Sequence, residues 1–552
     1  MRRRTIRDHE LAPDEIFLDS SNLPDFDRSR LEGRLEKPVS ERSYTALLGA
    51  LGVLLIVLLG QAWKLQVWQG EAFAAQSERN SLRQTVLFAD RGAITDRNGV
   101  VLAENVPSAS STERIYKTPG FANVLGYVSY PKKDSSGKYY DTETTGLAGV
   151  EAAFNAELAG ENGSHLIEED ALGKQLSEGS VIPPKNGATL KLSIDAGAQT
   201  ALYDAIQGLA DRIPFQGGSG ILMDVETGEL LALVSYPQYD PNVLSSGGPG
   251  SVIAGYSSDS RQVYLNRPVQ GLYTPGSVVK PVEAAGALTD KVITPGYTIN
   301  AQGSISVPNP YDPAHPTIFK DWKVIGIEDL RRAIAWSSDV YFYMVGGGYG
   351  DIKGLGIERL KHWYSAFGLT SPTGIELPGE KGGFVPDPAW KLKTYDDPWR
   401  IGDTYHTAIG QYAMQVTPLE MARAIAAIAN GGKLVRPTIL AGQAPSGESL
   451  AVNPADLQVV REGMRQGVTE GTSVGLNDLG FVKPAGKTGT AQLGVHNEWY
   501  NSWAVGFFPY DRPKYVYVVI MERGPSTNAI GGVYAMHQFL TALHRAAPEY
   551  FE

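Results

Sequence analysis

A long uncharged segment near the start of the chain constrains its architecture more than any other feature. No charged residue occurs between Arg42 and Lys64. Residues 43–63 would form a helix about 31 Å long, enough to cross a hydrocarbon layer of about 30 Å. Because the run is apolar on all faces, it favours a membrane-spanning helix over a buried helix of a soluble protein. Its length favours an uncleaved anchor over a signal peptide cut near residues 72–74.

The charges beside this segment predict its orientation. Only Lys64 lies close downstream, whereas five basic residues lie close upstream: Arg28, Arg30, Arg34, Lys37 and Arg42. The positive-inside rule then predicts a single-pass protein of the cell membrane with a cytoplasmic N-terminus. Residues 1–42 are polar and are expected to form a flexible tail. Everything after about residue 64 is expected to be periplasmic or extracellular.

Composition excludes several function classes. The chain has a formal net charge of −11, which argues against a nucleic-acid partner, since polyanions bind basic surfaces. It contains no cysteine, which excludes disulfides, a thiolate nucleophile and cysteine-ligated metal sites.

Periodicity indicates an α+β protein. The exported region is expected to contain an α+β pedestal at 64–195 and one large mixed domain at 196–552. In the pedestal, Asp96-Arg97-Asn98-Gly99 lies between apolar runs and is typical of a hairpin turn. The expected elements of the large domain are helices at 198–212, 278–289, 328–346, 418–430 and 535–546, paired strands at 219–236 and a buried strand at 515–522.

The first candidate motif is Ser277-Val278-Val279-Lys280. S-x-x-K occurs three times, but the copies at Ser129 and Ser135 lie in a polar loop and are interpreted as chance matches. Pro275-Gly276 predicts a turn that puts Ser277 at a helix start, where the helix dipole favours an anionic oxygen. Lys280 then shares a helix face with Ser277 and can serve as its base. The alternative is a structural serine with a surface lysine.

The second candidate is Ser337-Ser338-Asp339, which interrupts a strongly apolar helical context. Buried polar groups without partners cost about 1–3 kcal/mol each, so a polar site nearby is one explanation. A helix break with ordinary capping is the other.

The third candidate is Lys487-Thr488-Gly489-Thr490. Lys487 supplies a positive charge for a carboxylate, the threonine hydroxyls supply hydrogen bonds, and Gly489 permits the close approach of another backbone. The alternative is a loop lysine beside a turn.

Taken together and in this order, the three motifs resemble those of penicillin-binding proteins and class A β-lactamases. The chain resembles the monofunctional class B penicillin-binding proteins along nearly all of its exported region. The resemblance is carried by these segments: RGAITDRNGVVLAEN (91–105), GLAGVEAAFNAELAGENG (146–163), DVETGELLALVSYPQYDPN (224–242), NRPVQGLYTPGSVVKP (266–281) and AGKTGTAQ (485–492). FKDWK (319–323), GDTYHTAIGQ (402–411) and Asp339 favour the elongation-type branch over the division-type branch. Tyr412 departs from the family, which often has glycine there.

The resemblance implies a transpeptidase domain with a five-stranded, mainly antiparallel sheet between helical layers. It implies that Ser277 attacks a D-Ala-D-Ala stem pentapeptide to form an acyl-enzyme, with Lys280 as base. Ser337 would relay a proton, Asp339 would orient the site, and Lys487, Thr488 and Thr490 would hold the terminal carboxylate. The backbone N–H groups of Ser277 and Thr490 would form the oxyanion hole.

The resemblance also implies partners. These are peptidoglycan stem peptides, β-lactams as inhibitors and a membrane glycosyltransferase of the SEDS family, of the RodA kind. No cofactor is expected. Some relatives hold zinc, but Asp312, His315 and Asp321 supply only a partial ligand set here. A β-lactamase, a carboxypeptidase, a division-type enzyme and a mainly non-catalytic scaffold for the glycosyltransferase remain alternatives.

Overall fold

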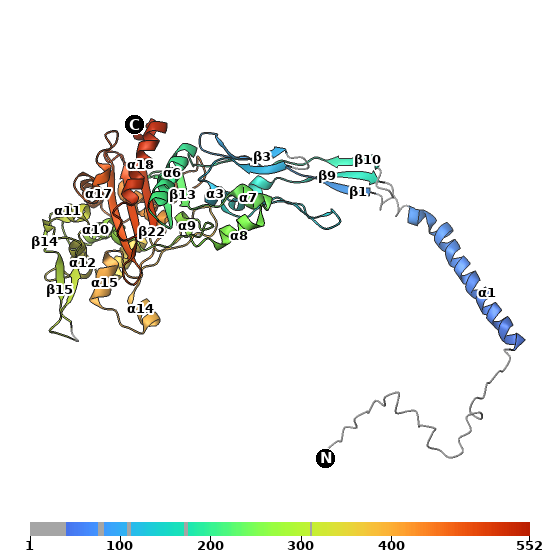
Figure 1. Ribbon diagram of the computed structural model, residues 1–552, viewed down its shortest axis with the longest axis horizontal. Coiled ribbons are helices and arrows are strands. Elements are labelled where there is room, and N and C mark those ends of the chain that lie inside the picture. The colour runs from blue at the N-terminus through green and yellow to red at the C-terminus, as the bar shows by residue number, and fades with distance from the viewer. Residues whose placement is uncertain (1–39, 75–81, 108–111, 170–174, 310–311) are drawn as a thin grey trace, which may run out of the picture. The chain divides into compact units, whose positions relative to one another are not determined.

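The computed structural model describes residues 40–74, 82–107, 112–169, 175–309 and 312–552 (Figure 1). The chain forms two compact units, one from residues 1–83 and 167–178 and the other from residues 84–166 and 179–552. The tail predicted at 1–42 lies outside the described residues up to residue 39. The predicted domain boundaries stay predictions.

Helix α1 (Glu41–Trp63) contains the long apolar run. Ser40 caps its N-terminus by accepting a hydrogen bond from the backbone N–H of Ser43. The helix continues as a short π-helix, η4 (Lys64–Trp68), and none of its residues is buried. The large apolar side chains from Leu51 to Leu59 are each more than half exposed, so the helix needs an apolar solvent. It is long and apolar enough to cross a membrane.

The pedestal contains a four-stranded sheet in the order β11-β2-β3-β4. Its strands are β2 (Ile94–Thr95), β3 (Val101–Pro107), β4 (Thr112–Tyr116) and β11 (Leu190–Lys191). Strands β2 and β3 form the predicted hairpin, in which the Asp96 carboxylate accepts from the backbone N–H groups of Asn98 and Val100. The completely buried Glu151 accepts from the guanidinium groups of Arg91 and Arg114.

A five-stranded antiparallel sheet forms the centre of the large domain, in the order β13-β12-β22-β21-β20. The strands are β12 (Gly217–Asp224), β13 (Leu230–Tyr236), β20 (Ala485–Leu493), β21 (Trp499–Phe508) and β22 (Tyr515–Pro525). Helices α6 (Ala196–Arg212) and α18 (Gly532–Ala546) contact each other and cover one face, as Figure 1 shows. Helix α16 (Pro418–Ala429) packs against the other face. The expected sheet between helical layers is confirmed.

Strand β22 shows how the sequence produces these two layers. Val516, Val518 and Ile520 belong to the core on the α16 side, whereas Tyr517 and Val519 belong to the core under α6 and α18. All five are buried, so the strand reads as a continuous apolar run and its period of two is visible only in the structure.

A second helical group lies around the serine and lysine motifs. It contains the 3₁₀ turn η5 (Gly276–Val279), which leads into α10 (Lys280–Thr289), as well as α11 (Leu330–Trp336), α12 (Asp339–Gly347), α15 (Ile401–Ala408) and α17 (Pro454–Thr469). The prediction of one helix at 328–346 is wrong, because the helix breaks at residues 337–338. The apolar pattern continues through the break, but Ser338 accepts from the backbone N–H of Tyr341 and starts a new helix.

Candidate active site

Ser277 lies in a tight turn that is held from two sides. Gly276 has φ 58°, a left-handed conformation that glycine adopts without strain, and its N–H donates to the carbonyl of Gly410 at 2.8 Å. The turn η5 packs against β20. Ser277 is therefore fixed at the start of the helical segment, as predicted, with its side chain partly exposed.

Lys280 is completely buried one turn beyond Ser277. Its Nζ donates to Asp339 Oδ1 at 2.7 Å and to the carbonyl of Ser337 at 2.8 Å, and lies 3.5 Å from Ser337 Oγ. The serine–lysine motif and the Ser337–Asp339 motif, about 60 residues apart in the sequence, thus meet at one amino group.

The break between α11 and α12 presents Ser337. Its backbone has φ 59°, in the left-handed region that non-glycine residues rarely adopt. Both sequence interpretations of this motif therefore hold: there is a helix break with a capping serine, and a polar site is built on it.

Strand β20 carries the third motif. The side chain of Lys487 is buried, and burial lowers its pKa well below the usual range, with the nearby charge of Lys280 lowering it further. Its Nζ donates to the carbonyl of Thr488 at 2.8 Å. Gly489 allows the strand to approach the serine turn, since a Cβ there would lie 2.8 Å from the carbonyl oxygen of Pro275.

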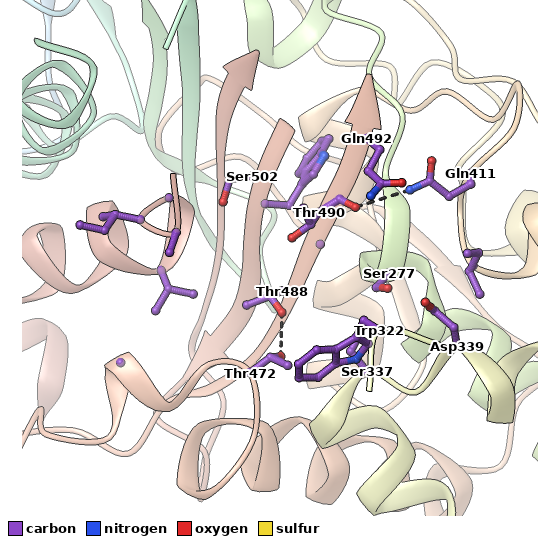
Figure 2. Close-up of a pocket in the computed structure, with 18 of the residues that line it drawn as sticks. Ser277, Trp322, Ser337, Asp339, Gln411, Thr472, Thr488, Thr490, Gln492 and Ser502 are labelled. Carbon is purple, nitrogen blue, oxygen red and sulfur yellow. Dashed lines mark hydrogen bonds between the residues drawn. The ribbon is translucent and has the colours of Figure 1, made fainter. Parts of the chain in front are cut away.

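A cleft of about 1300 Å³ brings these residues together. Six of the eight predicted residues line it: Ser277, Ser337, Asp339, Thr488, Gly489 and Thr490. Figure 2 shows Ser277 between β20, with Thr488 and Thr490, and the segment that carries Ser337 and Asp339. Lys280 and Lys487 are buried beside the cleft. The cleft therefore combines the hydroxyl of Ser277, the hydroxyl of Ser337 with the neighbouring amine of Lys280, and the threonine hydroxyls of β20.

Sequence reasoning assigned no role to several polar residues of the cleft. Gln411 Nε2 donates to the carbonyl of Thr490 at 3.4 Å, and Thr488 Oγ1 donates to Thr472 Oγ1 at 2.6 Å (Figure 2). Trp322 also lines the cleft. Gln411 and Trp322 lie in segments that carried the family resemblance, and only that resemblance could have indicated a role for them. No sequence pattern indicated a role for Thr472.

The three residues considered for zinc do not form one group. Asp312 and His315 form an exposed pair at 2.9 Å, whereas the Asp321 carboxylate accepts from Ser338 and the backbone of Val340. Within the described ranges, no three His, Asp or Glu side chains are arranged to hold a metal ion.

Comparisons with known proteins identify the family to which this chain is similar. Residues 218–537 match the penicillin-binding protein transpeptidase domain, and residues 107–192 match the penicillin-binding protein dimerisation domain. The chain is 30% identical to the peptidoglycan D,D-transpeptidase MrdA of Acinetobacter baumannii, over 86% of this chain and 84% of the relative. It is 26% identical to MrdA of Escherichia coli, over 88% of this chain and 92% of the relative.

Solved structures give the same result. A Pseudomonas aeruginosa PBP2 in complex with WCK 5153 superposes with a TM-score of 0.69 at 30% identity, covering 83% of this chain and 96% of that one. PBP2 of Helicobacter pylori, from a complex with MreC, gives 0.70 at 27% identity, with 85% and 99% covered. A peptidoglycan synthase complex gives 0.72 at 27% identity, with 90% and 98% covered.

Proposed function

This chain belongs to the penicillin-binding protein transpeptidases, and from that membership we propose that Ser277 is the nucleophile of a peptidoglycan D,D-transpeptidase that acts in cell-wall elongation. The function is that of the MrdA relatives, and the domain binds peptidoglycan and β-lactams. The observation that carries the assignment of Ser277 is the contact of Lys280 with both Ser337 and Asp339, beside a cleft that Ser277 lines.

Acylation follows from the side chains around the cleft. Ser277 Oγ attacks the carbonyl carbon of the penultimate D-Ala of a stem pentapeptide, and the side chain of Lys280 takes the hydroxyl proton. Ser337, 3.5 Å from Lys280 Nζ, passes a proton to the nitrogen of the departing D-Ala. The C–N bond breaks, free D-Ala leaves, and the peptide stays on Ser277 as an ester.

Charge in the cleft favours a substrate with a terminal carboxylate. Because burial and Lys280 both lower the pKa of Lys487, two neighbouring positive charges at these lysines are disfavoured. A carboxylate arriving near Lys487 stabilises its protonated form, with Thr488 and Thr490 as hydrogen-bond donors. The N–H groups of Ser277 and Thr490 form the oxyanion hole, in which one donor typically contributes about 2.7–4 kcal/mol.

Deacylation transfers the peptide to an amine of a neighbouring stem. The amine attacks the ester carbonyl, its proton passes to Ser277 Oγ through the same groups, and the new amide is the cross-link. Asp339 orients Lys280 in both half-reactions through their 2.7 Å contact.

Mass spectrometry after reaction with a penicillin tests the assignment. We expect one adduct, on the peptide that contains Ser277, and none in the Ser277→Ala variant. Ser135→Ala is the matched control, since Ser135 belongs to the S-x-x-K copy in an exposed loop. Retention of the adduct in Ser277→Ala would refute the assignment.

We also propose that α1 anchors the enzyme with residues 1–42 in the cytoplasm and the catalytic domain outside it. Because the chain has no cysteine, a single Ser136→Cys substitution in an exposed turn gives a unique label site. A membrane-impermeant maleimide should label it in intact cells or spheroplasts. Labelling only after membrane lysis would reverse the orientation.

The partner we propose for α1 is a SEDS-family glycosyltransferase of the RodA kind. The helix presents Gly49 and Gly52 with nothing within 4 Å of either position, which leaves room for close helix packing. Co-purification of the polymerase with the full chain, and its loss in Gly52→Leu, would support this contact. Equal recovery with both chains would exclude it at this position.

A further inference from the structure

Ser337 has a strained backbone conformation that its surroundings must stabilise. A non-glycine residue at φ 59° is strained and persists only where its surroundings hold it in place. Ser337 must nevertheless be held accurately, because its carbonyl and its hydroxyl both lie within 3.5 Å of Lys280 Nζ. The structure holds it from residues 321–323, which lie outside the three motifs.

Asp321 holds the side of the break that follows Ser337. Its Oδ2 accepts from Ser338 Oγ at 3.1 Å and from the N–H of Val340 at 2.9 Å. A carboxylate at the first turn of α12 is also favoured by the helix dipole. Ser338 already caps α12 through Tyr341, so Asp321 contributes a second, independent restraint on the same turn.

Trp322 and Lys323 hold the other side. Trp322 Nε1 donates to the carbonyl of Trp336, the residue before Ser337, at 3.1 Å. Lys323 Nζ lies 3.7 Å from the centre of the Trp336 ring. Figure 2 shows Trp322 beside Ser337 at the wall of the cleft.

We propose that Asp321 and Trp322 are positioning residues of the acyl transfer. Their contacts on the two sides of Ser337, which we call the clamp, keep Ser337 and Asp339 in contact with Lys280. The inference rests on the proposed function of Ser277, which the adduct on wild-type protein tests separately. It predicts that weakening the clamp slows the chemical step and leaves β-lactam binding and the fold largely intact, since Ser277 and β20 do not depend on this segment.

The test measures acylation of the full-length chain in detergent by a fluorescent penicillin over a range of concentrations, which separates the dissociation constant from the rate constant of acylation. In Asp321→Asn, which keeps the side-chain shape but loses the charge, we expect the rate constant to fall about ten- to a hundredfold. In Trp322→Phe, which removes only the N–H donor, we expect a fall of about three- to tenfold. Asp312→Asn is the matched control, because Asp312 lies exposed in the same region outside the clamp.

Two further variants keep the proposal falsifiable. Ser338→Ala combined with Asp321→Ala should cost less than the product of the single effects, since each variant removes the hydrogen bond between Ser338 Oγ and Asp321 Oδ2. Asp321→Glu should recover part of the rate. A wild-type rate constant in both Asp321→Asn and Trp322→Phe, or a loss confined to the dissociation constant, overturns the proposal. So does a rate that falls only in proportion to a loss of folded protein. Absence of a Ser277 adduct in the wild-type chain would instead reject the proposed function.

Discussion

Glu283 provides a quantitative test of how burial controls ionisation beside the catalytic helix. It lies one turn beyond Lys280 on α10 with no exposed surface, and within the described part of the chain neither carboxylate oxygen has a hydrogen-bond partner. Burial raises the pKa of Glu283 well above its usual value, and the charge of Lys280 offsets this only in part. Lys280 donates instead to Ser337 and Asp339. Folding therefore favours the protonated form of the Glu283 carboxyl.

The sign of the pH dependence follows from the two protonation states. The unfolded chain releases this proton above a pKa of about 4.3, whereas the folded chain keeps it, so the free energy of unfolding falls as pH rises from about 4.3 to the folded pKa. Within that interval the cost grows by about 1.4 kcal/mol for each pH unit. Glu283→Gln cannot ionise in either state and removes this cost. The unpaired amide carries its own penalty of roughly 1–3 kcal/mol, but that penalty is the same at both pH values.

The assay is the melting temperature of the full chain, followed by tryptophan fluorescence at pH 5 and pH 7. We expect the difference in melting temperature between Glu283→Gln and wild type to become more positive at pH 7 than at pH 5. Glu226→Gln, in the exposed turn between β12 and β13, should show no such change. An equal difference at both pH values, or a variant that is relatively less stable at pH 7, would mean that Glu283 is ionised and paired, and would refute the reasoning.

Two further substitutions test the strand side of the cleft. Lys487→Met should raise the melting temperature at pH 7, because burial lowers the pKa of the amine and so disfavours in the folded chain the positive charge that the unfolded chain carries. This gain in melting temperature should shrink as the pH approaches the unfolded lysine pKa of about 10.4. The rate of penicillin acylation should fall at least about tenfold. A lower melting temperature with normal acylation would contradict both parts. Gly489→Ala should slow acylation about tenfold or more, because its Cβ would lie 2.8 Å from the Pro275 carbonyl and push β20 away from the serine turn. Gly480→Ala, with nothing within 4 Å, is its control, and equal rates in the two variants would show that the strand can move without loss.

Most of the fold could be predicted because its elements carry local signals. The helix expected at 198–212 is observed as α6, Ala196–Arg212, with Asp195 as its cap, and the strands expected at 219–236 are observed as β12 and β13. The strand expected at 515–522 extends to Pro525 as β22. In each case periodicity and a turn or capping residue lie within the same few residues, so local and tertiary preferences agree.

The features that could not be predicted depend on distant partners. The break at Ser337 lies in a continuous apolar run, and the carboxylate that stabilises the following turn comes from Asp321, 17 residues before Ser338. The contact between Thr488 and Thr472 likewise joins the strand motif to a segment with no recognisable pattern. Neither residue type nor spacing predicts such pairs, because serine, threonine and aspartate side chains are usually exposed to solvent and need no protein partner there.

Only some of the left-handed backbone conformations around the cleft could be predicted from the sequence. Residues with left-handed backbones around the cleft include Gly276 at φ 58°, Ser337 at φ 59° and Tyr412 at φ 66°. Gly276 was predictable, because Pro-Gly is a turn signal and glycine adopts this conformation freely. The ring of Tyr412 packs edge-on against Trp390 and Trp399, with centroids 5.9 and 6.0 Å away.

The strained backbones of Ser337 and Tyr412 are therefore stabilised in the same way. Each holds a conformation that its own residue type disfavours, and in each case side chains from other segments supply the restraint: Asp321 and Trp322 for Ser337, and two tryptophans for Tyr412. Glycine would relieve the strain at either position. At Ser337 it would also remove the hydroxyl that faces Lys280, and at Tyr412 it would free the backbone next to Gln411, whose amide donates to Thr490. Relieving the strain at either position would therefore loosen groups that line the cleft.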